Sequence, residues 1–228
     1  MATFTGSDLT LVGVVMVRIL GIDPGTQVVG YSCLEVATGP SPGSDSSIRG
    51  VPLAMRGSNV VRAGSANAGD VRLVTAGVFR LGGRGTDLTQ RLLSLSEQFA
   101  ALVSKWKPSE MAIEEAFFGK SVQSALRIGE ARGVLLAESA RFGLDVFQYT
   151  PARVKRSVTG HGSARKDSVE NMLRQMIPAS QMPLPGALPA DATDAIAVAW
   201  TRLEEMRSPL SRPRRGSSSG RGHGLASD

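Results

Sequence analysis

The chain has 228 residues, 42% of them hydrophobic, and a formal net charge of +6. This length and apolar content suit one buried core and exclude both wholesale disorder and an integral membrane protein. A single cysteine, Cys33, excludes an internal disulfide framework and a zinc site built on several thiolates. The basic balance is compatible with a polyanionic partner but says nothing about fold.

Three segments stand apart from the core by composition. Residues 1–15 form an N-terminal extension, whose apolar run is too short for a bilayer and lacks the basic start of a signal peptide. Met16 is an alternative start, and we expect a cytoplasmic protein. Residues 38–70, rich in Gly, Ser and Pro, predict a flexible insertion. Residues 207–228 predict a disordered basic tail, which leaves 16–206 as a single domain.

The predicted elements begin with three strands and then alternate between helix and strand. Periodicity and turn residues predict strands at Val17–Asp23, Val28–Val36, Val71–Leu81, Glu110–Ala116 and Asp145–Tyr149. They predict helices at 88–106 with Thr86 as N-cap, at Ser121–Phe142, after Thr150-Pro151, at Ser163–Met176 and at Pro189–Glu205. This order indicates an α/β fold, with a mixed five-stranded sheet flanked by helices.

Acidic residues follow two of the strands. Asp23 ends the most apolar strand, at the edge where open α/β sheets carry functional groups, although an Asp before Pro-Gly also suits a plain turn. Glu114 and Glu115 end another strand. Because strand side chains alternate, the two glutamates lie on opposite faces. A strand end reaching solvent is the alternative interpretation of this pair.

Two further acids, Asp191 and Asp194, begin an alanine-rich helix. A spacing of three places them on one helix face. Acids in a first turn also stabilise a helix through its dipole, which is the structural alternative. The alanines favour a functional role, because they let the helix backbone approach a sheet closely and solvated carboxylates do not require that.

Four carboxylates brought together would form an all-oxygen site. Such a site suits Mg²⁺ or Mn²⁺ rather than zinc, and a divalent cation relieves the repulsion between the acids. Two ions about 3.5–4 Å apart would activate a water and stabilise the leaving oxygen in phosphodiester hydrolysis. The sequence alone does not show that the four acids converge.

A basic stretch lies between the two acidic regions. It contains five cations and no acid between Pro151 and Lys166, which suits phosphate contacts, although a solvated helix face is the usual explanation. His161 lies between two glycines, so it either reaches a phosphate or is an exposed loop residue. The cations are Arg153, Lys155, Arg156, Arg165 and Lys166.

Five sequence blocks in order resemble the bacterial RuvC-type Holliday-junction resolvases, which have a ribonuclease H-like fold. They are residues 19–26 (ILGIDPGT), 112–117 (AIEEAF), 129–133 (GEARG), 154–160 (VKRSVTG) and 190–195 (ADATDA). The resemblance implies a homodimeric, magnesium-dependent endonuclease that nicks two strands of like polarity across a four-way DNA junction. It also implies RuvA and RuvB, a branch-migration motor, as partners.

The family motifs assign roles to individual residues. Its four catalytic and metal-binding carboxylates fall on Asp23, Glu114, Asp191 and Asp194, although Glu115 stands where the family often has Gln. Its junction-unpairing aromatic falls on Phe117, which a core position would otherwise explain. Its DNA-binding lysines fall on Lys155 and Lys166, beside Arg156 and Arg165. The stripe Ala125, Gly129, Gly133, Ala137 and Ala140 either packs on the protein's own sheet or contributes to a dimer interface.

Three alternatives compete with a junction resolvase. An actin-like ATPase shares only residues 21–26, and the core is too short for its two lobes. A non-catalytic junction-binding module would be better served by losing the carboxylates. A ribonuclease H-like nuclease acting on another structured nucleic acid is the nearest alternative.

Overall fold

The computed structural model describes residues 15–38, 71–83, 85–115 and 122–208. The expected extension, insertion and basic tail lie almost entirely outside these residues, and so does Phe117. Three of the expected boundaries shift, because one strand already begins at Val15, another includes Thr38, and the last helix includes Arg207. No helix in the described part of the chain is long and apolar enough to cross a bilayer.

One mixed sheet organises the molecule, as the sequence predicts. Its strand order is β3-β2-β1-β4-β5, with β1 in the centre. β2 and β3 run antiparallel to their neighbours, whereas β4 and β5 run parallel to β1. The strands are β1 (Val15–Asp23), β2 (Val28–Thr38), β3 (Val71–Arg80), β4 (Glu110–Glu114) and β5 (Asp145–Tyr149).

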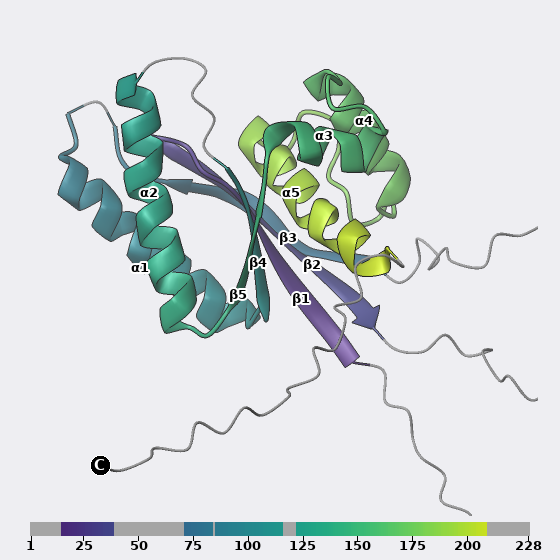
Figure 1. Ribbon diagram of the computed structural model, residues 1–228, viewed down its shortest axis with the longest axis horizontal. Helices are drawn as coiled ribbons and strands as arrows, with labels where there is room; N and C mark the ends of the chain where they lie inside the picture. Colours follow the sequence, from purple (N-terminus) through teal and green to yellow (C-terminus); the bar gives the residue numbers. More distant parts are fainter. Residues whose placement is uncertain (1–14, 39–70, 84, 116–121, 209–228) are drawn as a thin grey trace, which may run out of the picture.

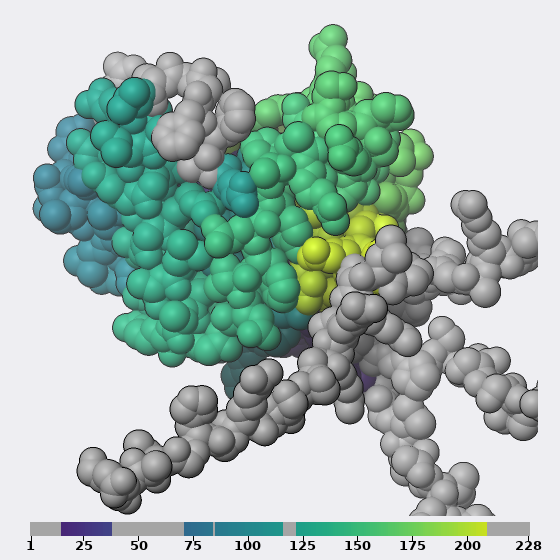
Figure 2. Space-filling model, in the orientation of Figure 1, coloured from purple at the N-terminus to yellow at the C-terminus, as the bar shows by residue number. Residues whose placement is uncertain are grey.

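Five helices cover the two faces of this sheet. Figure 1 shows α1 and α2 on one face and α3, α4 and α5 on the other. The space-filling view separates the same two groups, α1 and α2 in blue and teal and α3 and α4 in green (Figure 2). The helices are α1 (Leu88–Trp106), α2 (Val122–Arg141), α3 (Pro151–Thr159), α4 (Lys166–Met176) and α5 (Ala190–Arg207).

The N-cap of α1 and the start of α4 differ from the sequence prediction. The N-cap of α1 is Asp87 rather than Thr86, and its carboxylate accepts from the amide of Thr89 at 2.9 Å. Helix α4 begins at Lys166 rather than Ser163, after Arg165, which makes no side-chain capping bond. The predicted cap of α3 is confirmed, because the Thr150 hydroxyl accepts from the amide of Arg153.

The central strands are apolar on both faces, which is why they are buried. Alternation along β1 sends Ile19 into the core beneath α5, and Leu20 and Ile22 into the core beneath α1 and α2. The same alternation along β4 sends Ala112 towards α5 and Ile113 away from it. The last residues of β1 and β4 therefore both lie on the α5 face of the sheet.

Candidate active site

The carboxyl ends of β1 and β4 bring two of the predicted acids side by side. The parallel register pairs Ile22 with Ile113, so Asp23 and Glu114 follow at adjacent positions. Both lie on the face covered by α5, as the alternation requires. Glu115 follows β4 and is exposed, on the opposite side of the chain. The structure thus separates the two glutamates in the way that the sequence predicts.

Helix α5 lies directly against β1 and β2 because two glycines leave room for it. A Cβ at Gly21 would collide with the Ala195 carbonyl, and a Cβ at Gly30 would collide with the Asp191 carbonyl. The Ser32 hydroxyl also donates to the Ala195 carbonyl at 2.9 Å. The predicted close approach of the alanine-rich helix is therefore observed, and it brings the two α5 acids to the ends of the strands.

A cavity of about 280 Å³ lies where these elements meet. The Lys166 ammonium is 2.5 Å from Asp194 Oδ2, although the lysine side chain itself remains 73% exposed. Asp191 does not line this cavity. Its lining residues are Asp23, Glu114, Pro151, Val154, Lys155, Lys166, Val169, Asp194 and Ala197.

Burial and mutual repulsion disturb the acids in this cavity. The pKa of Asp23 rises to about 8, chiefly because the carboxyl is buried and then because Glu114, Asp194 and Asp191 repel its charge. The pKa of Glu114 rises to about 7, through burial and then repulsion by Asp194. The charge of Lys166 opposes both increases. The two strand-end acids thus lack full neutralisation by the protein itself.

Arg132, on α2, supports the end of β4, which sequence reasoning missed. Its guanidinium donates to the backbone carbonyl of Glu114, and at 2.6 Å to Gln148 Oε1 on the neighbouring β5. Burial lowers the pKa of this arginine, and the charge of Glu115 opposes that shift. Arg132 lies within the 129–133 block, but a bond to a backbone carbonyl leaves no signature in the sequence.

The predicted basic residues lie on α3, on α4 and in the loop between them. Lys155 and Lys166 reach the cavity, whereas Arg156 is exposed on α3. Arg165 is 86% exposed and 3.4 Å from Asp167, an acid just beyond the predicted cation run. His161 is exposed, with Nδ1 3.2 Å from the Thr159 carbonyl.

The donor chemistry of the cavity fits a hard divalent cation. Asp23, Glu114 and Asp194 offer only carboxylate oxygens, the ligands that Mg²⁺ and Mn²⁺ prefer. Their repulsion is the charge imbalance that such an ion relieves. Within residues 15–38, 71–83, 85–115 and 122–208, no three acidic, histidine or cysteine side chains are drawn together tightly enough to form a metal cluster.

Comparison with known proteins identifies the family. Residues 51–202 match the model of the family described as "Crossover junction endodeoxyribonuclease RuvC". A RuvC from Chromohalobacter salexigens is 34% identical over 88% of this chain and 90% of its own length. A RuvC from Heliobacterium modesticaldum is 33% identical over 79% of this chain and 90% of its own length. The chain belongs to the RuvC family.

Solved RuvC-type structures share its fold. T. thermophilus RuvC, in complex with a Holliday junction substrate, matches with a TM-score of 0.63 and 24% identity, covering 84% of this chain and 95% of that one. Ydc2, the yeast mitochondrial Holliday junction resolvase, matches with a TM-score of 0.53 and 16% identity, over 84% and 80%. These matches confirm the predicted ribonuclease H-like fold of a RuvC-family nuclease.

Proposed function

We propose that this protein resolves four-way DNA junctions in recombination and repair, by paired hydrolytic nicks in strands of like polarity. One observation carries the proposal. In a member of the RuvC family, Asp23, Glu114 and Asp194 share one cavity with Lys155 and Lys166. The curated relatives are named crossover junction endodeoxyribonucleases, and the T. thermophilus relative holds a junction substrate.

Asp23, Glu114 and Asp194 would hold two Mg²⁺ ions, with Asp191 completing the set from the start of α5. Bound Mg²⁺, or Mn²⁺ in its place, would activate a water for attack on phosphorus and stabilise the leaving oxygen. The charge of Asp191 already acts on Asp23, although Asp191 stands outside the cavity.

The basic residues would hold the DNA against these acids. Lys155 and Lys166 line the cavity and would contact the scissile phosphate there, and exposed Arg156 and Arg165 would extend the same positive surface. Because its side chain is flexible, Lys166 can leave its ion pair with Asp194 and bind a phosphate oxygen instead. Phe117, three residues after Glu114, would act as the wedge that unpairs bases at the junction.

Homodimer formation through α2 fits a substrate with two equivalent cleavage points. The small-residue stripe does not pack on the sheet, because Gly129 and Gly133 are exposed and a Cβ on either would meet open space. Val122 and Leu126, on the same helix, are 77% and 63% exposed. We also propose a cytoplasmic location and association with RuvA and RuvB.

The decisive experiment compares a synthetic four-way junction with a linear duplex of the same arm sequences, with and without Mg²⁺. We expect paired, ligatable nicks in the junction that require the ion, and an Asp23→Asn variant that binds the junction without cutting it. Cutting of the duplex at a similar rate would identify a nuclease without junction specificity. Junction binding without cleavage, in Mg²⁺ and in Mn²⁺, would identify a binding module.

A further inference from the structure

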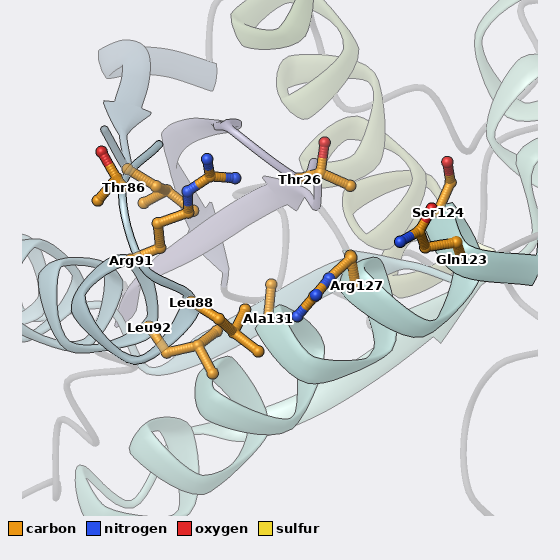
Figure 3. Close-up of a pocket in the computed structure, with 10 residues that line it drawn as sticks. Thr26, Thr86, Leu88, Arg91, Leu92, Gln123, Ser124, Arg127 and Ala131 are labelled. Atoms are coloured by element: carbon orange, nitrogen blue, oxygen red, sulfur yellow. The ribbon is translucent and has the colours of Figure 1, made fainter. Parts of the chain in front are cut away.

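A second cavity, of about 300 Å³, opens on the α1–α2 side of the sheet (Figure 3). Four segments build it: the loop after β1, the connection between β3 and α1, the start of α1 and the first turns of α2. In the view of Figure 3, the hydroxyls of Thr26, Thr86 and Ser124 and the Arg91 guanidinium point to the same side. Its lining residues are Thr26, Leu81, Thr86, Leu88, Arg91, Leu92, Gln123, Ser124, Arg127 and Ala131.

Whereas the first cavity contains three acids, the charged side chains that line this second cavity are basic. Its described lining residues include two arginines and no acid, together with three hydroxyls and one amide. Hydroxyls, amides and guanidinium groups are the side chains that contact phosphate oxygens in DNA complexes. At 300 Å³, it lies at the small end of ligand sites, which suits one phosphate with its sugar.

Both arginines retain donors for a ligand. The Nη2 of Arg91 donates a hydrogen bond to the Gly83 carbonyl at 2.9 Å. Its Nε is buried without a hydrogen-bond partner among the described residues. Arg127 lies 3.2 Å from Glu130, in an ion pair whose side chains are 44% and 39% exposed. An exposed pair of this kind contributes little stability, so a phosphate can replace the carboxylate at little cost.

The two cavities lie at the same end of the sheet. Thr26 follows Asp23 by three residues, and Gln123 belongs to the first turn of the helix that follows Glu114 in the chain. The acidic cavity opens on the α5 side of this edge, and the basic cavity on the α1–α2 side. A strand that runs along this edge, with its scissile phosphate in the first cavity, would carry its neighbouring phosphates towards the second.

We propose that this basic cavity binds the DNA backbone on the strand that is cut, a few nucleotides from the scissile phosphate. The proposal rests on the junction-cutting function proposed above and adds a contact surface on the face of the sheet opposite α3 and α4. Arg91 and Arg127 supply the charge, and Thr26, Thr86 and Gln123 supply neutral hydrogen bonds.

The test measures binding of a four-way junction, in chelator so that no cleavage occurs, across a series of salt concentrations. The variants are Arg91→Ala and Arg127→Ala. The matched control is Arg141→Ala, which removes an arginine in the same i,i+3 pairing with a glutamate, at the far end of α2. We expect each cavity variant to weaken binding about 3- to 10-fold and to lower the salt slope by about 1, while the control matches wild type.

The outcomes separate this proposal from the function on which it rests. If wild type and Arg141→Ala bind and cut the junction and both cavity variants match them, the basic cavity does not hold DNA and the proposal is overturned. If wild type itself neither binds nor cuts the junction, the proposed function fails and this contact fails with it. Should Arg91→Ala lose its fold by circular dichroism, Arg127→Ala alone decides, because its side chain is at the surface.

Discussion

Carboxylates at the two ends of β1 and β4 have opposite electrostatic surroundings. Towards their amino ends, carboxylates are neutralised by arginine. Glu35, on β2, lies across from Arg18 of β1. Its carboxylate forms ion pairs with Arg18 and Arg72, each at 2.7 Å, and these bonds hold the pKa of Glu35 below the usual range. Glu110, the first residue of β4, receives Arg202 at 2.8 Å.

At the carboxyl ends, buried acids face each other instead. Asp23 and Glu114 have raised pKa values because burial and neighbouring acids outweigh the lysines nearby. The amino-end pairs contribute to folding, whereas a cluster of like charges opposes it. We propose that the carboxyl ends hold a ligand of positive charge, at a cost in stability.

The largest expected effect separates two adjacent glutamates. Glu114→Gln should lower junction cleavage about a thousand-fold, because removing one carboxylate from a metal site loses several kcal/mol of transition-state stabilisation. Glu115→Gln is the matched control, with an exposed side chain on the opposite side of the chain, and should cleave like wild type. Single-turnover cleavage of a labelled junction measures both. The reverse order would mean that the site is one residue out of register.

At the amino end, breaking one ion pair should affect folding. Arg202→Ala leaves Glu110, only 13% exposed, without its partner, and should lower the free energy of unfolding by about 3 kcal/mol. Urea denaturation followed by circular dichroism measures this loss. The double variant Glu110→Gln with Arg202→Met removes both charges and should recover much of it. An Arg202→Ala protein as stable as wild type would show that these pairs do not hold the fold.

Arg132 positions the carboxyl end of β4, where Glu114 lies. Arg132→Gln should lower the cleavage rate about 10- to 100-fold with little change in junction affinity, since it acts on Glu114 through a backbone carbonyl. Arg132→Lys, which keeps one donor, should recover part of the rate. A loss of affinity with an unchanged rate would instead assign Arg132 to DNA contact.

The smallest effect is the pH dependence of the Glu35 pair. Because the folded-state pKa of Glu35 lies below its usual 4.5, the pair stabilises the fold fully above that value, and the stabilisation is lost as pH falls through the folded-state pKa. Glu35→Gln should therefore be about 1 kcal/mol less stable than wild type at pH 7, and the difference should shrink as the pH is lowered to 3. Urea denaturation at both pH values tests this. A difference that persisted at pH 3 would assign the loss to packing.

Most of the fold and three acids of the cavity could be predicted from the sequence, because both depend on local sequence patterns. Apolar runs marked the strands, alternation separated Glu114 from Glu115, and the spacing of Asp191 and Asp194 marked one helix face. Long-range contacts had no such signal. Glu110 and Arg202 are 92 residues apart, and Arg132 reaches a backbone atom. Thr86 and Asp87 are both ordinary capping residues, so only geometry decides between them.

We predict that Asp23 opposes folding until a divalent ion binds, and the melting temperatures of wild type and Asp23→Asn measure this. Without divalent ions, we predict that the variant melts above wild type, by about 2–4 °C for each kcal/mol of repulsion removed. Added Mg²⁺ or Mn²⁺ should raise the melting temperature of wild type and leave that of the variant nearly unchanged. A variant that melts below wild type without ions, and that responds equally to added ions, would show that Asp23 neither opposes folding nor holds the ion.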